Sequence, residues 1–140
     1  MGAPVDLLRS VTVFAGLGDR ELRRIADSFK ESSFPAGHPV AEEGRSGVGF
    51  FVIADGEARV TIKGEEVGVL RAGDSFGEIA LIDDGPRTAT VTAATDLHCY
   101  GMTSWEFRPL VEENARIAWP LLQSLARRIR EAERRSADEV

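Results

Sequence analysis

The spacing of hydrophobic residues divides the chain into three parts. Near the start, four apolar residues share one face of a predicted helix: Leu22, Ile25, Ala26 and Phe29. Asp19 precedes them as the expected N-cap. Beyond about residue 33 the apolar runs become short and are separated by turn residues, which is typical of strands. After residue 103 helical spacing returns, so the predicted order is helices, strands, helices.

About six to eight short strands are predicted between residues 33 and 102. The apolar runs lie at residues 50–53, 58–62, 67–69, 89–93 and 97–102. Asp55-Gly56 is the strongest two-residue hairpin signal in the chain, and Lys63-Gly64 predicts a second tight turn. Many short strands with regular turns indicate a closed or double-sheet antiparallel roll.

Two helices are predicted after the strands. Thr103 is the expected N-cap of the first, and Pro109 should kink this helix or end its first half. Because a proline inside a helix costs about 3 kcal/mol, the last helix is expected to begin near Trp119, with Pro120 in its first turn. Its apolar stripe contains Leu121, Leu122, Leu125, Ile129 and Ala132.

The composition narrows the class of protein. A length of 140 residues fits one domain, and 43% hydrophobic with 29% charged residues is ordinary for a globular chain. The net charge of −6 argues against direct binding to nucleic acid, because such proteins carry basic surfaces. No apolar run approaches the ~20 residues that cross a membrane, and the lone Cys99 favours a reducing compartment. We therefore expect a cytoplasmic protein without membrane contact.

The sequence predicts neither a catalytic site nor a metal site. His38 and His98 are far apart in the chain and have no neighbouring histidine or second cysteine, so both are interpreted as ordinary strand residues. Trp105 and Trp119 are interpreted as packing anchors. We expect no metal and no enzymatic activity.

One stretch, FGEIALIDDGPRTATV at residues 76–91, concentrates residues that suit an anion. Gly77 lets the main chain approach a ligand without a side-chain clash. Residues 78–81 can form one helical turn whose first N–H groups point toward a single spot. Arg87 adds a full positive charge on a planar fork that matches two phosphate oxygens, and Pro86 limits where this fork points.

Glu78 indicates what is attached to the anion. A carboxylate repels a phosphate but accepts hydrogen bonds, so its expected partner is a hydroxyl group one sugar-width away. Phosphate at Arg87 and a ribose hydroxyl at Glu78 together describe a nucleotide whose 2′-hydroxyl is free. A triphosphate would need more positive charge, and the sequence has no Walker-type loop.

This stretch resembles the phosphate-binding cassette of cyclic-nucleotide-binding domains, the family found in cAMP-dependent kinase regulatory subunits, catabolite-activator-type regulators and gated channels. The family pattern F-G-E-x-A-L-x-x-x-x-P-R-x-A is filled by Phe76, Gly77, Glu78, Ala80, Leu81, Pro86, Arg87 and Ala89. The stretches VFAGLGDREL, GDSF and LLQSLARRIRE are also similar to the family, so the resemblance covers most of the chain.

The resemblance implies a fold. It implies a mainly β protein with flanking helices (α+β), built as an eight-stranded antiparallel β-roll, also called a double-stranded β-helix jelly roll. One domain would span residues 1–140, with N-terminal helices in 1–30, the roll in 31–103 and C-terminal lid helices in 104–135. The phosphate-binding cassette would occupy residues 76–90.

The resemblance also implies roles for individual residues. Gly77, Ala80 and Ala89 would offer main-chain groups to the cyclic phosphate, Arg87 would pair with its charge, and Glu78 would hold the ribose 2′-hydroxyl. The implied ligand-binding residues are Phe76, Gly77, Glu78, Ile79, Ala80, Arg87, Thr88, Ala89 and Val60. Val60 and Ile62 are expected to face inward as an apolar wall for the sugar or base. The residues of the lid expected to touch the base are Gln123, Ser124, Arg127 and Arg128.

Thr88 bears on the choice of base. In the family this position is often small in members that prefer cAMP, whereas a threonine hydroxyl there can hold the 2-amino group of a guanine. We favour cAMP as the ligand, with cGMP as the alternative.

The leading hypothesis is a stand-alone cyclic-nucleotide sensor that signals through its C-terminal helix to a protein partner or a second copy. The apolar stripe of that helix either packs on the roll or forms a dimer seam, as in activator-type relatives. The alternatives are a ligand-blind dimerisation or docking domain, a fragment of an activator-type transcription regulator that lacks its DNA-binding part, and a roll-shaped enzyme.

Overall fold

The computed structural model of the chain describes residues 2–44, 49–83 and 86–138, with only the main chain of residues 79, 137 and 138. Within these residues, eight antiparallel strands form two four-stranded sheets. The first sheet has the order β1 (Lys30–Phe34), β8 (Leu97–Met102), β3 (Phe50–Asp55), β6 (Ser75–Phe76). The second has the order β2 (Pro39–Ala41), β7 (Thr90–Ala93), β4 (Ala58–Ile62), β5 (Glu65–Leu70). The predicted eight-stranded antiparallel roll is confirmed.

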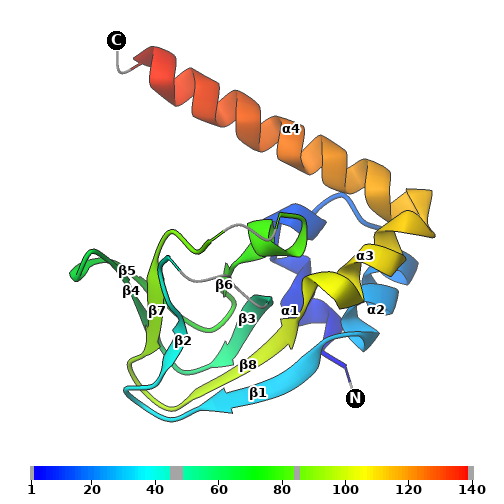
Figure 1. Cartoon of the computed structure of the whole chain (residues 1–140). Helices are drawn as coiled ribbons and strands as arrows, with labels where there is room; N and C mark the ends of the chain where they lie inside the picture. The colour runs from blue at the N-terminus through cyan, green and yellow to red at the C-terminus, as the bar shows by residue number, and fades with distance from the viewer. Residues whose placement is uncertain (1, 45–48, 84–85, 139–140) are drawn as a thin grey trace.

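Helices flank the strands at both ends of the sequence. Before them come α1 (Val5–Arg9), the 3-10 turn η1 (Thr12–Phe14) and α2 (Asp19–Asp27), and after them α3 (Ser104–Glu112) and α4 (Ala115–Asp138). A second 3-10 turn, η2 (Glu78–Leu81), lies between β6 and β7. Figure 1 shows α1, α2 and α3 gathered at one end of the roll, while α4 extends from them with its far end standing away from the sheets. None of the described helices is both long and apolar enough to cross a membrane.

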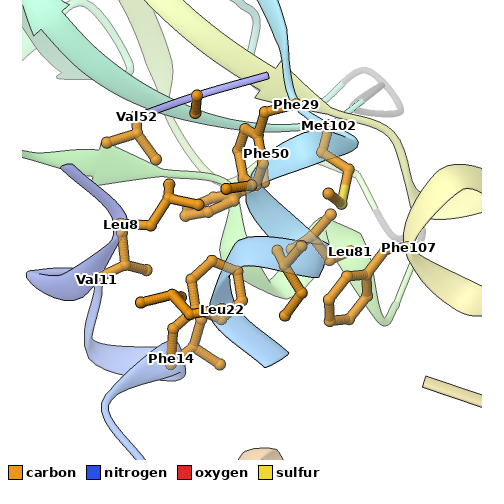
Figure 2. Packing of buried hydrophobic residues seen from close by; sticks show 14 of the residues in the cluster. Leu8, Val11, Phe14, Leu22, Phe29, Phe50, Val52, Leu81, Met102 and Phe107 are labelled. Carbon is orange, nitrogen blue, oxygen red and sulfur yellow. The ribbon is translucent and has the colours of Figure 1, made fainter. Parts of the chain in front are cut away.

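Buried apolar side chains form two clusters. The smaller cluster fills the roll with residues of both sheets, such as Ile53, Val91 and Cys99, and burial raises the pKa of the Cys99 thiol to about 11. The larger cluster joins the first sheet to the helices, and Figure 2 shows its close packing. Leu81 of η2 belongs to this larger cluster and lies beside Phe107 of α3. The turn η2 is therefore anchored in the packing between the helices and the roll.

The two predicted tight turns have different outcomes. Lys63-Gly64 joins β4 to β5 as a hairpin, with positive φ angles of 52° and 83° that suit a type I′ turn. Asp55-Gly56 is not a hairpin, because β3 pairs with β6 and β8 while β4 pairs with β5 and β7. Gly56, with φ of 96°, instead turns the chain from one sheet to the other. A hairpin signal identifies a turn but not which strands pair.

The start of α4 differs from the prediction. The helix begins at Ala115, so Pro120 lies inside it. The side chain of Asn114 accepts a hydrogen bond from the main-chain N–H of Arg116 at 3.0 Å, and Ile117 is fully buried. This cap and the packing of the first turn offset the lost hydrogen bond at the proline.

Three other helix ends compare with the predictions as follows. Thr103 is the N-cap of α3, as predicted, and it forms a capping box with Glu106. The same helix continues through Pro109 to Glu112, so of the two expected effects of the proline the end of the helix is wrong and the kink stays a prediction. The N-cap of α2 is Gly18 and not Asp19, which is the first residue of the helix.

Both tryptophans lie on the surface. Trp105 is 66% exposed and Trp119 is 63% exposed, so the prediction that they anchor the packing is wrong. Each stands on the outward side of its helix, because the buried positions are taken by Phe107 in α3 and Ile117 in α4.

Thr103→Ala is expected to lower the free energy of unfolding by about 1 kcal/mol, because Glu106 loses the hydroxyl that accepts from its main-chain N–H at 3.3 Å. Thr103→Ser keeps that hydroxyl and should retain most of the stability. Urea unfolding of both variants measures the difference, and equal losses would show that the methyl group and not the cap is responsible.

Candidate functional site

A cavity of about 550 Å³ lies between the second sheet and the segment that follows β6. Its apolar wall comes from three strands, because Ala41 of β2 is the register partner of Val91 of β7, which in turn pairs with Val60 of β4. Leu70 of β5 adds to this side of the cavity. The rest of the cavity is lined by Ser75 and by residues of the predicted cassette: Phe76, Gly77, Glu78, Ala80, Asp83, Pro86, Arg87, Thr88 and Ala89.

Arg87 is the cation of this cavity. Its Nη2 donates to the carbonyl of Gly49, and its own carbonyl accepts from the N–H of Gly44 at 2.8 Å. Its Nε is buried without a hydrogen-bond partner among the described residues. Burial lowers the pKa of the guanidinium, and the nearby carboxylate of Glu78 offsets part of this effect. A half-buried guanidinium with an unsatisfied N–H is suited to an anion that enters the cavity.

Gly77 makes room for that guanidinium. Its φ angle is 84°, which favours glycine, and a Cβ at this position would overlap Nη1 of Arg87 and lie 2.7 Å from the carbonyl oxygen of Gly49. The main chain at Gly77, the guanidinium of Arg87 and the carbonyl of Gly49 therefore come together in the space that a side chain at residue 77 would occupy.

The turn η2 follows directly and confirms the predicted helical turn over residues 78–81. Phe76 is buried at its start and stacks on Phe51, with ring centroids 5.4 Å apart. Ala80 is buried, and its N–H donates to the carbonyl of Gly77 at 2.9 Å. The side chain of Ile79 lies outside the described part of the chain. The turn thus connects the cavity, through Leu81, to the larger hydrophobic cluster.

Glu78 has a partner that the sequence did not predict. Arg128 of α4 reaches its carboxylate, with Nη2 2.8 Å from Oε1, and both side chains are partly exposed. Arg128 was expected to contact a base. In the structure it contacts the carboxylate that lines the cavity, and this ion pair links the distal half of α4 to η2.

The other residues proposed for the lid do not line the cavity. Ser124 is buried, and its hydroxyl donates to the carbonyl of Thr12 at 3.0 Å, so its contact with a base stays a prediction. Gln123 and Arg127 are exposed on α4. Ile62, expected beside Val60, is 40% exposed, because a bulge between Val60 and Thr61 shifts the alternation at the end of β4.

Several residues of the site were missed from the sequence. Ala41, Leu70 and Val91 lie far apart along the chain, and only the strand register brings them to one wall. Gly49, whose carbonyl holds Arg87, carries no local signal for that role. Alternation along β7 could have placed Val91 inward, but not opposite the cassette. Among the described residues, no group of three or more His, Cys, Asp or Glu side chains could hold a metal ion.

Comparison with known proteins defines the class. The cyclic nucleotide-binding domain family matches residues 31–114, which is more than half of the chain. The chain therefore belongs to the cyclic nucleotide-binding domain family, whose role is regulatory rather than catalytic.

Individual relatives agree with this assignment. The cAMP-dependent protein kinase regulatory subunit of Yarrowia lipolytica is 44% identical over 92 residues, which are 64% of this chain and 24% of that protein. The CRP-like cAMP-activated global transcriptional regulator of Mycobacterium tuberculosis is 26% identical over 138 residues, which are 95% of this chain and 62% of that protein. The crystal structure of the N-terminal domain of a transcriptional regulator from Streptomyces coelicolor A3(2) superposes with a TM-score of 0.85 at 28% identity, covering 91% of this chain and 94% of that one.

The chain spans about a quarter of the kinase regulatory subunit and less than two thirds of the CRP-like regulator. The activities and partners of those whole proteins are therefore not assigned to this chain by similarity alone.

Gly77→Ala and Gly73→Ala form a matched pair. Both glycines have positive φ angles, 84° and 92°, but a Cβ at Gly73 meets nothing within 4 Å. Each substitution should therefore cost backbone strain of about 1 kcal/mol, whereas only Gly77→Ala displaces Arg87. We expect Gly77→Ala to abolish cyclic-nucleotide binding in a calorimetric titration and Gly73→Ala to retain it. Equal affinities for cAMP would contradict the role given to the missing side chain.

Proposed function

We propose that this chain is a sensor module for a cyclic nucleotide, with cAMP as the favoured ligand, that signals through α4 and catalyses no reaction. The observation that carries the proposal is the guanidinium of Arg87, half-buried in a cavity with an unpartnered Nε. Membership of the cyclic nucleotide-binding domain family supports the same ligand class. One cation suits the single charge of a cyclic phosphate better than the two charges of an open monophosphate.

Other residues of the cavity suit the phosphate, the ribose and the base of a cyclic nucleotide. Main-chain N–H groups of Gly77 and Ala89 are proposed to hold the phosphate beside Arg87, and the N–H of Ala80, which donates to the carbonyl of Gly77 in the structure, would join them by turning toward the ligand. Glu78 is proposed to accept from the ribose 2′-hydroxyl, since an ionised carboxylate only accepts. The apolar row of Ala41, Val91 and Val60 suits the face of a sugar or base.

Two connections from the cavity to the helices support signalling through α4. Leu81, the last residue of η2, is buried in the same hydrophobic cluster as Phe107 of α3. Ile117 and Leu121 of α4 belong to this cluster as well. Glu78 is ion-paired with Arg128 on the same helix. A ligand that binds one arrangement of η2 more tightly than another therefore shifts the population of α4 positions. The outward face of α4 would then present a changed surface to a protein partner.

Arg87→Met tests the proposal and separates binding from folding. The ligand-free variant is expected to stay within about 1 kcal/mol of the wild type, because losing the hydrogen bond to Gly49 is offset by removing a buried charge. At cAMP concentrations of 100 times the dissociation constant, the wild type should gain about 2.7 kcal/mol, and the variant nothing. Thermal unfolding with and without cAMP measures both quantities.

Arg59→Met is the control for that experiment. Arg59 is an exposed arginine on β4 that faces Glu66 at 3.6 Å and lies outside the cavity lining. This variant should keep the full stabilisation by cAMP. If Arg87→Met is stabilised as strongly as Arg59→Met, the chain binds nucleotide elsewhere or not at all, and a ligand-blind docking domain becomes the better account.

Thr88→Ala tests the choice of base. Thr88 is exposed at the edge of the cavity, where a hydroxyl is able to contact the 2-amino group of a guanine. Losing one such hydrogen bond should weaken cGMP about two- to tenfold and leave cAMP unchanged. Parallel calorimetric titrations give both affinities, with Thr92→Ala on β7 as a control outside the cavity lining. An equal loss for both nucleotides would assign the hydroxyl to the shared phosphate or sugar instead.

A further inference from the structure

One side of α4 carries a row of exposed, mainly cationic side chains. The row begins in the first turn of the helix and continues for about 27 Å in steps of three and four residues. Its members are Arg116, Trp119, Gln123, Arg127, Arg130 and Arg134. The buried side of the same helix contains Ile117, Leu121 and Ser124, and the apolar side contains Ala118, Leu122, Leu125 and Ile129. With about 3.6 residues per turn, the row lies roughly 120° around the helix from either of these sides.

The arginines of this row have no carboxylate partners. Within the described part of the chain, no ion pair is formed by Arg116, Arg127, Arg130 or Arg134. Arg130 is three residues from Arg127 and four from Arg134, and like charges at this spacing destabilise a helix. The chain has a net charge of −6, yet it leaves this positive charge uncompensated along one side of α4.

A shallow groove of about 450 Å³ lies at the start of the row, between the first turns of α2 and α4. Its lining consists of Gly18, Glu21, Ala115, Arg116, Trp119 and Pro120. Trp119 is 63% exposed, so most of its indole is open to a partner. Pro120 is held against the loop before α2, because a Cβ on Gly16 would lie only 3.2 Å from the proline Cβ. Figure 1 shows the opposite end of α4 standing away from the sheets, where the last arginines of the row are accessible.

The lining of the groove distinguishes between anionic partners. A row of guanidinium groups pairs with carboxylates and with phosphates. The groove also contains the carboxylate of Glu21, which repels a phosphate and only accepts hydrogen bonds. A nucleic acid or a lipid surface would bring phosphates to this carboxylate, whereas a polypeptide brings main-chain N–H groups. The exposed indole of Trp119 beside it suits an apolar side chain of such a polypeptide.

We propose that the arginine row and the groove form one docking surface for an acidic segment of another protein. Carboxylates at steps of three and four residues on a helical segment lie alongside Arg127, Arg130 and Arg134, because two helices have the same rise per residue. An apolar side chain at one end of the segment enters the groove and covers Trp119. The surface contains none of the residues that line the cavity at Arg87, so this docking goes beyond the proposed function and does not depend on it.

Fluorescence anisotropy with labelled peptides tests this surface in the absence of nucleotide. The probe is a helical peptide of alanine and glutamate, with glutamates at steps of three and four residues and a leucine at one end. It is made with the leucine at either end and with alanine in its place. At low ionic strength, one leucine version should bind with a dissociation constant below about 100 μM, about fivefold or more tighter than the alanine version. Its affinity should fall as salt is added. Failure of every version to bind at about 1 mM would overturn the proposal.

Two matched pairs of variants locate the binding. Trp119→Ala should remove the preference for leucine, whereas Trp105→Ala changes a similarly exposed tryptophan of α3 and should keep it. Arg130→Glu should weaken the leucine peptide about fivefold or more, whereas Arg135→Glu makes the same charge change off the row and should stay within about twofold. All four side chains are exposed, so each variant is expected to fold. Equal losses within either pair would contradict the docking surface.

Other occupants and other failures give different results. Labelled duplex DNA and vesicles that contain phosphatidylserine are titrated under the same conditions. Tighter binding of either probe than of the leucine peptide, lost in Arg130→Glu, would overturn the choice of an acidic protein. Thermal unfolding with cAMP tests the proposed function separately, and all four variants should keep the stabilisation, because none of them changes the cavity lining. A chain that is stabilised by cAMP but binds no peptide loses only the docking surface. A chain that binds the peptide but is not stabilised by cAMP or cGMP loses only the proposed function.

Discussion

The placement of one guanidinium organises the whole cavity. Arg87 is held in a half-buried position in a chain of net charge −6, where its burial lowers the pKa and leaves its Nε unsatisfied. The neighbouring main chain accommodates the guanidinium. Residue 77 is a glycine, so no side chain overlaps Arg87, and the carbonyl of Gly49 and the N–H of Gly44 form hydrogen bonds with Arg87. A buried cation that is not fully satisfied is unfavourable for stability alone. It makes physical sense when an anion completes the arrangement.

The turn η2 belongs both to the lining of the cavity and to the packing of the helices. It presents Glu78 and Ala80 to the cavity, and Leu81, the next residue of the same turn, is buried among the helices. Any ligand that changes the position of η2 must therefore change the packing around Phe107 and the first turns of α4. The ion pair between Glu78 and Arg128 adds a second, polar link to the same helix.

The sequence identified the contiguous stretch that lines the cavity. The residues from Phe76 to Ala89 could be recognised together because they lie within fourteen positions, although Gly77 and Arg87 come into contact only in the fold. The apolar wall was only partly predictable, since Ala41, Val91 and Val60 become neighbours through strand register. The hairpin signal at Asp55-Gly56 failed for the same reason: local turn chemistry does not decide which sheet the next strand joins. The start of α4 was misjudged because the burial of Ile117 and the cap at Asn114 outweigh the local cost of Pro120.

Pro120 affects how α4 is attached to the rest of the protein. It removes one main-chain hydrogen bond in the second turn of the helix, where Ile117 and Leu121 are buried against the body. Beyond the proline the helix stays attached to the body through buried Leu121, the hydrogen bond from Ser124 to Thr12 and the ion pair between Arg128 and Glu78. The missing hydrogen bond therefore lies inside the attached part of the helix, and the ten residues from 129 to 138 extend about 15 Å past the last of these contacts. Bending at Pro120 would have to break or move the contact at Glu78, so the geometry of the cavity restrains the direction in which the end of the helix points.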